Sequence, residues 1–594
     1  MKLNTLFLTT LLLSLGIVPY TTPLWAEEAP KTTLSAETPP AESVDKQYII
    51  HTVQLKYIHD HADNPPLASL MNIPFTLGKR DSDYIAPEEG TPSIQTTFAD
   101  ISSLSPPDLF SSSAILHMGR VIVDHLNSLH FLGINVFVDS NEIDKAGKDV
   151  RKADDYNITL LINLIPVGEV TVVDMNQAAD IDKDNQPAFL LQIAQSSPIQ
   201  PGDLIHQGKL NDYVFSLNRS PSKKVNVQLT SSEQGNLAKL SYLLQKKRPI
   251  HLYANLSNTG TTSSRRWVER FGAIIYRPIT SDDIFSAEYV TTDFRIVHSV
   301  QGLYEIATRS TSDIRFKAKA GWSEFTSSEF NIPNTSFKGS QNQLSLEITK
   351  TLLQRHDFFF DAFVKGTLQH LFVDNTVLGS SRKTKNNLFL AVLGIRFEQK
   401  RPRSTLYGEV YIEQNVSSLA KTKREDLTLL GRETIADRWK TVTATLVAST
   451  YLGRLSHHEL AFRGSGTDAF NYRLIPQIQG AIGGVHTVRG YPQAIAVGDT
   501  TWFGQAEYKY HFPWKQPNWR GQAILFFDGG KALITRPLSF ETSKTLVGTG
   551  VGLKIDYKTY AQIHADWGVA LKNIPADHIS NGYHTVNLSL TLIY

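Results

Sequence analysis

The sequence predicts a mainly β protein, in which two small α+β modules precede an antiparallel transmembrane β-barrel of sixteen strands. From Pro249 onward the helical periodicity disappears, and segments of about 9–14 residues with alternating apolar and polar side chains follow one another between turn-rich stretches. Before Pro249, two successive stretches combine strand and helix patterns. The N-terminus is typical of an exported chain, and no later run of about eighteen apolar residues follows it. An exported membrane protein without such a run must cross the membrane as a closed barrel.

The N-terminal residues predict a signal peptide. The apolar run from Leu6 to Val18 is too short to span a bilayer and suits a signal-peptide core, although a membrane anchor is the alternative. Ala26 is the expected cleavage point, and the proline-rich residues after it are expected to form a flexible linker. The predicted divisions are a signal peptide at 1–26, a linker at 27–46, α+β modules at 47–166 and 167–248, and the barrel at 249–594.

Composition excludes several classes of function. The formal net charge is +2, which does not indicate a nucleic-acid-binding protein, and the absence of cysteine excludes disulfides and thiol nucleophiles. The sequence contains no nucleophile elbow, phosphate-binding loop or His-Glu-x-x-His motif. The pairs His59/His61 and His457/His458 are interpreted as polar surface sequence rather than metal ligands. We therefore expect no enzyme activity, no metal and no cofactor.

Each module has its own order of predicted elements. In the first, a strand is followed by an insertion rich in loops at residues 60–107, and Pro106-Pro107 favours a helix that starts near Asp108. The predicted elements of the first module are a strand at 48–58, a helix at 108–129 and strands at 133–138 and 156–165. Those of the second are a strand at 169–175, helices at 186–195 and 203–218, and strands at 225–229 and 238–244.

The barrel pattern gives sixteen candidate strands. The last is the clearest, because its apolar residues alternate with polar ones up to the terminal Tyr594, as a barrel strand that faces lipid requires. The candidates begin near Ile250, Arg265, Asp283, Arg295, Asp313, Ser340, Asp357, Asn386, Arg403, Lys440, His457, Thr500, Trp519, Thr545, Thr559 and His584.

One loop and one strand in this region predict a charge pair inside the barrel. The loop carries Arg489 between glycines, which allow the backbone to approach a wall closely. The strand around Asp528 places this carboxylate on one face with Phe526 and Gly530. An inward arginine and an inward aspartate would pair, whereas the alternative is a solvated loop arginine beside a turn aspartate. Glycines that would support the loop, or relieve crowding in a curved wall, are Gly483, Gly484, Gly548, Gly550 and Gly552.

These motifs resemble those of the outer-membrane transporters of two-partner secretion, the haemolysin secretion/activation type, which share a superfamily with the barrel-assembly protein of bacterial outer membranes. Val488-Arg489-Gly490-Tyr491 is similar to the family's motif in the sixth extracellular loop, and Phe526-x-Asp528-x-Gly530 to its partner motif on the barrel wall. Leu217-Asn218-Arg219-x-Pro221 and Asn258-Thr259-Gly260 resemble the second module and the barrel entry. Departures are Ser257, where aspartate is usual, and Ser263-Ser264, where glycine is expected.

The resemblance implies a function and a location. It implies two periplasmic POTRA modules, a sixteen-stranded barrel in the outer membrane, and insertion of that barrel by the cell's barrel-assembly machinery. It also implies a secreted client of the adhesin or haemolysin type, bound unfolded in the periplasm and exported through the pore. The alternatives are a factor that assembles other outer-membrane proteins, and a passive porin or receptor. The short, proline-rich linker does not favour an N-terminal plug helix of the kind found in some family members.

Overall fold

The computed structural model divides into two compact units, which meet at the peptide bond between Lys246 and Lys247. The predicted signal peptide, most of the predicted linker and Ser263-Ser264 lie outside the residues that the structure describes. The described residues are 46–80, 82–103, 106–176, 188–232, 237–260, 266–307, 313–327, 336–377, 380–420, 427, 432, 434–453, 456–539 and 541–594. Within them, no helix has both the length and the apolar character needed to cross a membrane.

The first module is built on a three-stranded sheet in the order β2-β8-β7. β2 pairs in parallel with β8, and β7 pairs antiparallel with β8. The helix α4 packs against this sheet through buried residues that include Met118, Ile122 and Leu126. The elements are β2 (Thr52–Tyr57), α4 (Ser112–Ser128), β7 (Ile134–Val138) and β8 (Asn157–Leu164).

The insertion predicted as loop-rich at 60–107 contributes three strands to a second sheet, which the prediction missed. Five short strands pair in the order β1-β6-β4-β3-β5, and their side chains share one core with the module. Strands of three to six residues are too short to reveal a period of two in the sequence. The elements are β1 (Gln47–Ile50), α2 (Leu67–Met71), β3 (Phe75–Arg80), β4 (Asp83–Ile85), β5 (Ser93–Thr96), α3 (Phe98–Ile101) and β6 (Asp108–Ser111).

The helix predicted from Asp108 begins four residues later. Residues Asp108–Ser111 form β6, which pairs antiparallel with β1, so tertiary pairing overrides the local helix signal. The helix is instead capped by Ser111, whose side chain accepts a hydrogen bond of 3.1 Å from the amide of Ala114.

The second module has a three-stranded sheet in the order β10-β11-β9, with two helices. Asn218 ends the second helix and binds both backbone groups of Val225, accepting from its nitrogen at 2.6 Å and donating to its oxygen at 2.8 Å. This contact explains why an asparagine stands at the helix end of the Leu217–Pro221 motif. The elements are β9 (Val167–Asp174), α5 (Ala188–Gln195), α6 (Gln207–Asn218), β10 (Lys223–Ser231) and β11 (Ala238–Lys246).

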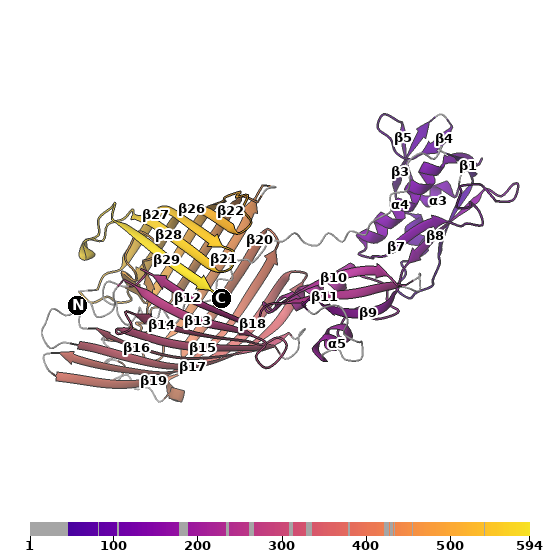
Figure 1. Ribbon diagram of the computed structural model, residues 1–594. Helices are drawn as coiled ribbons and strands as arrows, with labels where there is room; N and C mark the ends of the chain where they lie inside the picture. Colours follow the sequence, from indigo (N-terminus) through magenta and orange to yellow (C-terminus); the bar gives the residue numbers. More distant parts are fainter. Residues whose placement is uncertain are drawn as a thin grey trace. The chain divides into compact units, whose positions relative to one another are not determined.

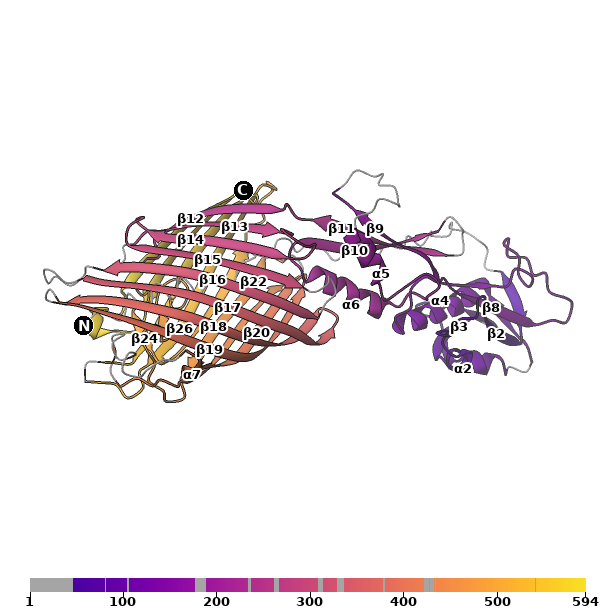
Figure 2. The same ribbon diagram turned by 90° about the horizontal axis from the view of Figure 1, so that it is seen from below.

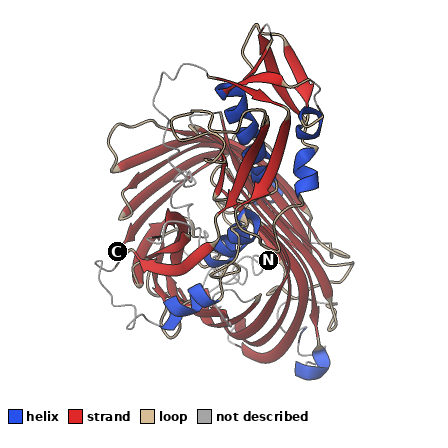
Figure 3. Cartoon of the chain, turned by 90° about the vertical axis from the view of Figure 1, so that its right-hand side faces the viewer, coloured by secondary structure: helices blue, strands red, loops and turns tan. Residues whose placement is uncertain are grey.

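The second unit is a closed antiparallel barrel of sixteen strands, as predicted (Figures 1 and 3). The first strand, β12, pairs with the last, β29, through five residue pairs from Tyr253↔Ile593 to Ser257↔Ser589. Tyr594 extends this seam, because its amide and carbonyl exchange hydrogen bonds with Leu252. The strands are β12 (Ile250–Ser257), β13 (Val268–Tyr276), β14 (Ile284–Thr292), β15 (Val297–Ala307), β16 (Ile314–Ser327), β17 (Ser336–Arg355), β18 (Phe358–Val377), β19 (Ser380–Arg401), β20 (Ser404–Asn415), β21 (Lys440–Leu452), β22 (His458–Asp468), β25 (Thr500–His511), β26 (Trp519–Leu533), β27 (Lys544–Tyr557), β28 (Ala561–Ala570) and β29 (His584–Ile593).

Four strands are longer than the predicted 9–14 residues. β26 has 15 residues, whereas β17 and β18 have 20 and β19 has 22 (Figure 2). The start of β18 was predicted to within one residue, but the great length of these strands was not, and the pattern of β18 shows why. Val364 and Leu368 face outward and are more than half exposed, whereas further along the strand the apolar residues are the buried Leu371 and Val373. The apolar face therefore changes sides, and the alternation loses its phase.

The antiparallel pairing places the loops at two ends of the barrel. The loops after β12, β14, β16, β18, β20, β22, β26 and β28 lie at one end, and the turns between the other strands lie at the end where β12 begins. The loop after β22, residues 469–499, is thus the sixth at its end. It contains the two-stranded ribbon of β23 (Gly480–Ile482) and β24 (Ala496–Gly498). The short helices of this unit are α7 (Ser417–Ala420) and η2 (Pro575–Asp577).

Candidate functional site

The sixth loop folds back against the inner face of the barrel. Between β23 and β24 the chain makes a tight turn, in which the amide of Gly483 donates to the Thr487 hydroxyl at 2.7 Å and the amide of Gly484 donates to the carbonyl of Val488 at 3.0 Å. The φ angles of Gly483 and Gly484 are 114° and 89°, a region that side chains with a Cβ rarely adopt. The turn presents the next residue, Arg489, to the wall.

Arg489 forms an ion pair with Asp528 of β26. Its Nε and Nη2 atoms donate to the two carboxylate oxygens at 2.7 and 2.8 Å, and its backbone amide donates to Oδ2 at 3.0 Å. The side chains of Arg489 and Asp528 are 3% and 0% exposed. Asp528 lies on the inward face of β26, because its neighbours Leu525 and Phe527 are more than half exposed on the other face.

Two further groups hold the same guanidinium. Its Nη1 atom donates to Glu507 of β25 at 2.7 Å, and its Cζ atom lies 3.6 Å from the centroid of the Phe526 ring, within cation–π distance. Burial alone would lower the pKa of Arg489, but the hydrogen bonds and charge of Asp528, with the charges of Glu507 and Asp566, outweigh burial and raise the pKa. The arginine is therefore a permanent cation between two carboxylates and a ring.

The glycines of the wall have different roles. A Cβ on Gly548 of β27 would overlap the carbonyl oxygen of Arg489, so this glycine makes room for the loop. Cβ atoms on Gly550 and Gly552 would instead meet Trp567 and Asp566 of the neighbouring strand β28, so these two glycines relieve crowding within the wall. On the loop side, a Cβ on Gly490 would lie 2.6 Å from the carbonyl carbon of Val569.

The remaining predicted residues also lie at this contact. Tyr491 is 1% exposed, and its hydroxyl lies 2.8 Å from the Lys572 carbonyl and 3.0 Å from the Val547 carbonyl. A Cβ on Gly530 would lie 3.1 Å from the side chain of Val488. The exception is Tyr594, which is 80% exposed at the end of β29 and belongs to the outer surface.

Sequence reasoning missed three residues of this contact. Gly568 of β28 faces the loop, and a Cβ on it would lie 2.5 Å from the nitrogen of Gly490. Glu507 is the second carboxylate on Arg489, and the side chain of Gln505, also on β25, donates to the carbonyl of Val485 at 3.3 Å. The spacing of Gln505 and Glu507, two residues apart on one face of a strand, was the available signal.

This site provides a specific attachment between a loop and a wall. Within the described residues, no group of three or more His, Asp or Glu side chains could hold a metal ion. The contacts of Arg489 are hydrogen bonds and ion pairs, which can form and break without covalent chemistry. Breaking a buried pair of this kind by removing one partner costs about 3–5 kcal/mol in a dry interior and less where water enters.

The sequence matches the profile of one protein family, described as haemolysin secretion/activation protein ShlB/FhaC/HecB, over residues 239–555. This match spans more than half of the 594 residues. It begins at the last strand of the second module and includes both Arg489 and Asp528. A search of curated proteins gave no match.

Solved structures share the fold at low sequence identity. CdiB from Escherichia coli superposes with a TM-score of 0.62 at 13% identity, covering 96% of this chain and 94% of that one. CdiB from Acinetobacter baumannii gives a TM-score of 0.56 at 15% identity, covering 93% of each chain. BamA from Haemophilus ducreyi lacking POTRA domains 1–3 gives 0.50 at 9% identity, covering 92% of this chain and 100% of that one. Together with the family match, this barrel and its two modules show that the chain belongs to the haemolysin secretion/activation (ShlB/FhaC/HecB) family of outer-membrane transporters of two-partner secretion, whose POTRA modules lie in the periplasm.

Proposed function

We propose that this transporter binds an unfolded exoprotein in the periplasm through its POTRA modules and exports it through the barrel, without enzymatic activity. The observation that carries the proposal is the attachment of Arg489 to Asp528 inside the barrel wall. A loop held by buried ion pairs on the inner face of a pore is suited to a path that must be closed at rest and opened for a client. The client's binding, its path and the role of the loop are all parts of this proposal.

The first module provides the most favourable edge for an extended client. An unfolded chain can add a strand to a sheet edge, and proteins normally protect such edges with charges or proline. The edge strand β7 has the sequence Ile-Asn-Val-Phe-Val, with no charge and no proline, and its Phe137 is 47% exposed. By contrast, the edge strand β10 of the second module starts with Lys223 and Lys224. We therefore assign client capture to β7.

Passage requires the sixth loop to leave the wall. The loop contacts strands β25 to β28 through Val485, Val488, Arg489, Gly490 and Tyr491. A client segment that reaches the lumen as an extended hairpin would displace these contacts. The energy for net export comes from folding of the client outside the cell, where a long β-rich protein buries apolar surface.

The test compares the culture medium and the outer membrane of cells with the intact gene, a deletion and Arg489→Ala. A dedicated secretion transporter predicts that one or a few large exoproteins disappear from the medium in both mutants, while the outer-membrane protein profile is unchanged. A general loss of barrel proteins from the membrane would instead identify an assembly factor. Unchanged secretion with Arg489→Ala would reject the role given to the loop.

Client capture has its own test. A photo-crosslinking amino acid is placed at Phe137 on β7 and, as the matched control, at Gln228 on the edge strand β10. We expect an adduct at position 137 that contains the same exoprotein that the deletion removes from the medium, and little adduct at position 228. Equal adducts at both positions, or adducts with other barrel proteins, would contradict capture by β7.

A further inference from the structure

The tall part of the barrel wall has an apolar inner face. On β18 the inward residues Thr367 and Gln369 are polar, but the next two, Leu371 and Val373, are apolar and at most 1% exposed. On β19 the inward residues Leu388 and Leu390 continue this surface and are 0% and 3% exposed. An apolar face on the lumenal side is costly unless something covers it.

Two loops cover it. Ile435 and Trp439, from the loop after β20, and Leu474 and Ile475, from the loop after β22, are all 0% exposed and form one hydrophobic cluster with the wall residues. The backbones of the two loops are joined, since the amide of Ala436 donates to the carbonyl of Arg473 at 3.0 Å. The described residues of these loops therefore form a packed lid inside the rim.

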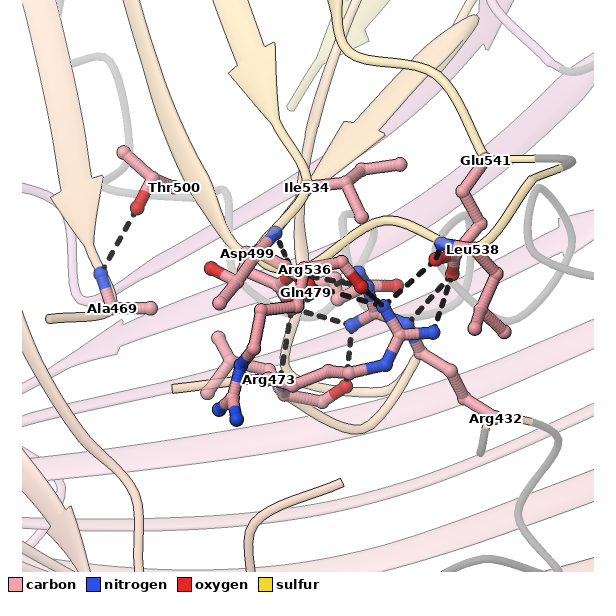
Figure 4. A network of polar contacts seen from close by, with 12 residues as sticks. Arg432, Ala469, Arg473, Gln479, Asp499, Thr500, Ile534, Arg536, Leu538 and Glu541 are labelled. Carbon is pink, nitrogen blue, oxygen red and sulfur yellow. Dashed lines mark hydrogen bonds and ion pairs between the residues drawn. The ribbon is translucent and has the colours of Figure 1, made fainter. Parts of the chain in front are cut away.

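A cluster of four buried charged residues fastens the lid (Figure 4). Arg432 of the loop after β20 pairs with Asp499, at the end of the loop after β22. Arg473 donates from Nη1 and Nη2 to the two oxygens of Glu541, at 2.8 and 2.9 Å, and Glu541 belongs to the loop after β26. The Nε atom of Arg432 also donates to Glu541 at 3.1 Å, which joins the two pairs. All four side chains are at most 6% exposed.

Backbone groups complete the cluster. Asp499 also accepts from the amides of Leu474 and Thr535, each at 2.8 Å, and from the side chain of Gln479 at 3.2 Å. Glu541 accepts from the amide of Leu538 at 2.9 Å. Asp499 thus holds both ends of the sixth loop and the start of the loop after β26. Two arginines balance two carboxylates, so the four charges of the cluster sum to zero.

We propose that the described residues of the loops after β20, β22 and β26 form an outer gate, and that Arg432, Arg473, Asp499 and Glu541 are the latch that keeps it shut. This gate lies at the end of the barrel opposite the entry of β12, beyond the Arg489 contact. It rests on the proposed passage of a client through the lumen, but the latch can be tested without a client. A neutral ion-pair cluster suits a reversible latch, because its charges can be hydrated when the loops separate, whereas the apolar lid supplies the tendency to close again.

The first test measures access to the lid. The chain has no cysteine, so Ala469→Cys, in the lid cluster and buried, is a single reporter for an impermeant maleimide added to intact cells. We expect labelling to be at least about tenfold faster when the reporter is combined with Asp499→Asn or Glu541→Gln, since a buried charge then lacks its partner. The matched control is Glu324→Gln, which removes an ion pair at the surface. In that pair the side chain of Lys338 is 48% exposed and that of Glu324 is 30% exposed.

Equal labelling rates in the latch variants and the control would overturn the latch. Heat-modified migration on gels checks that each barrel has assembled. The gate and the secretion role can be rejected independently. If the latch variants label faster but deletion of the gene leaves the culture medium unchanged, the gate is supported and the secretion role is rejected.

The second test locks the gate. In the double variant Ala436→Cys and Tyr472→Cys, which keeps all four latch residues, a short bifunctional thiol reagent joins the two loops beside the hydrogen bond between the backbones of Ala436 and Arg473. We expect the untreated variant to export its client and the cross-linked one to retain it, because the two loops can no longer separate. Normal export through the cross-linked barrel would overturn the proposal.

Discussion

Gly548 of β27 and Arg489 of the sixth loop are in backbone contact, and a Cβ on Gly548 would occupy the position of the Arg489 carbonyl oxygen. The contact joins the loop to the wall at the same residue whose side chain pairs with Asp528. Arg489 therefore attaches the loop to the wall in two ways: its backbone packs closely against Gly548, and its side chain forms an ion pair with Asp528.

Gly548→Ala should displace the loop from the wall without removing any polar group. The added methyl forces the backbone of Arg489 away, at a cost of about 1–3 kcal/mol. We expect a lowered unfolding midpoint in detergent and a loop that proteases cleave more readily. Gly529→Ala is the matched control, because a Cβ there meets no atom within 4 Å. Similar effects of both substitutions would show that the close approach does not hold the loop.

The two carboxylates on Arg489 should differ in importance. Asp528→Ala removes a fully buried partner with three hydrogen bonds and should destabilise the loop contact by up to about 3–5 kcal/mol. Glu507→Ala removes a carboxylate that is itself 23% exposed and accepts one hydrogen bond from Arg489, so it should cost about 1 kcal/mol or less. Arg489→Ala should reduce export more than barrel assembly. Denaturant unfolding and secretion assays of the three variants check this order, and an equal loss for Asp528 and Glu507 would contradict it.

Tyr491→Phe should loosen the loop after β28. The hydroxyl of Tyr491 accepts from the amide of Lys572 at 3.1 Å, and phenylalanine leaves that group without this partner, which costs about 1–3 kcal/mol. We expect faster hydrogen exchange in residues 571–583. Tyr583→Phe, in the same loop but 38% exposed, is the control and should leave exchange unchanged.

The latch should resist moderate acid. Burial alone would raise the pKa of Glu541, but the hydrogen bonds and charges of Arg473 and Arg432, with the amide of Leu538, outweigh burial and lower the pKa below 4.5. Because the folded pKa is depressed, the stabilisation is complete above about pH 4.5 and is lost as the pH falls through the lower folded value. Hydrogen exchange of residues 469–479, corrected for its intrinsic rate, should therefore stay constant from about pH 8 to 5 and increase only below 4.5. Glu541→Gln should remove this dependence, and an increase between pH 7 and 5 would contradict the assignment.

The sequence was most informative where side chains alternate against lipid. All sixteen strand starts lie within six residues of the predicted ones, because outward apolar and inward polar residues repeat with a period of two. The largest difference is at β19, predicted near Asn386 and starting at Ser380, where outward residues such as Lys383 and Lys385 are polar. There the wall has left the membrane, and the lipid no longer imposes the pattern.

Contacts between loops that are far apart in the sequence could not be predicted from the sequence alone. The pair of Arg489 and Asp528 was predicted from two short motifs, each of which has an identifiable face or turn. The latch residues Arg432, Asp499 and Glu541 lie in three loops without periodicity, and only the barrel topology brings these loops to the same end. The sheet of the first module was missed for a related reason, since its short strands pair across long sequence separations.

The strands differ in length around the barrel, so the height of its rim is uneven. For a rise of about 3.3 Å per residue and a tilt of roughly 40°, a strand of 20 residues reaches about 50 Å along the axis, twice the roughly 25 Å apolar band of such barrels. Across the barrel, β28 and β29 have only 10 residues each. The rim is thus shaped like a spout, tall along β17 to β19 and low along β28 and β29. A polypeptide that leaves such a barrel is shielded from solvent on the side of β17 to β19. It is released on the side of β28 and β29, beside the seam where β12 pairs with β29.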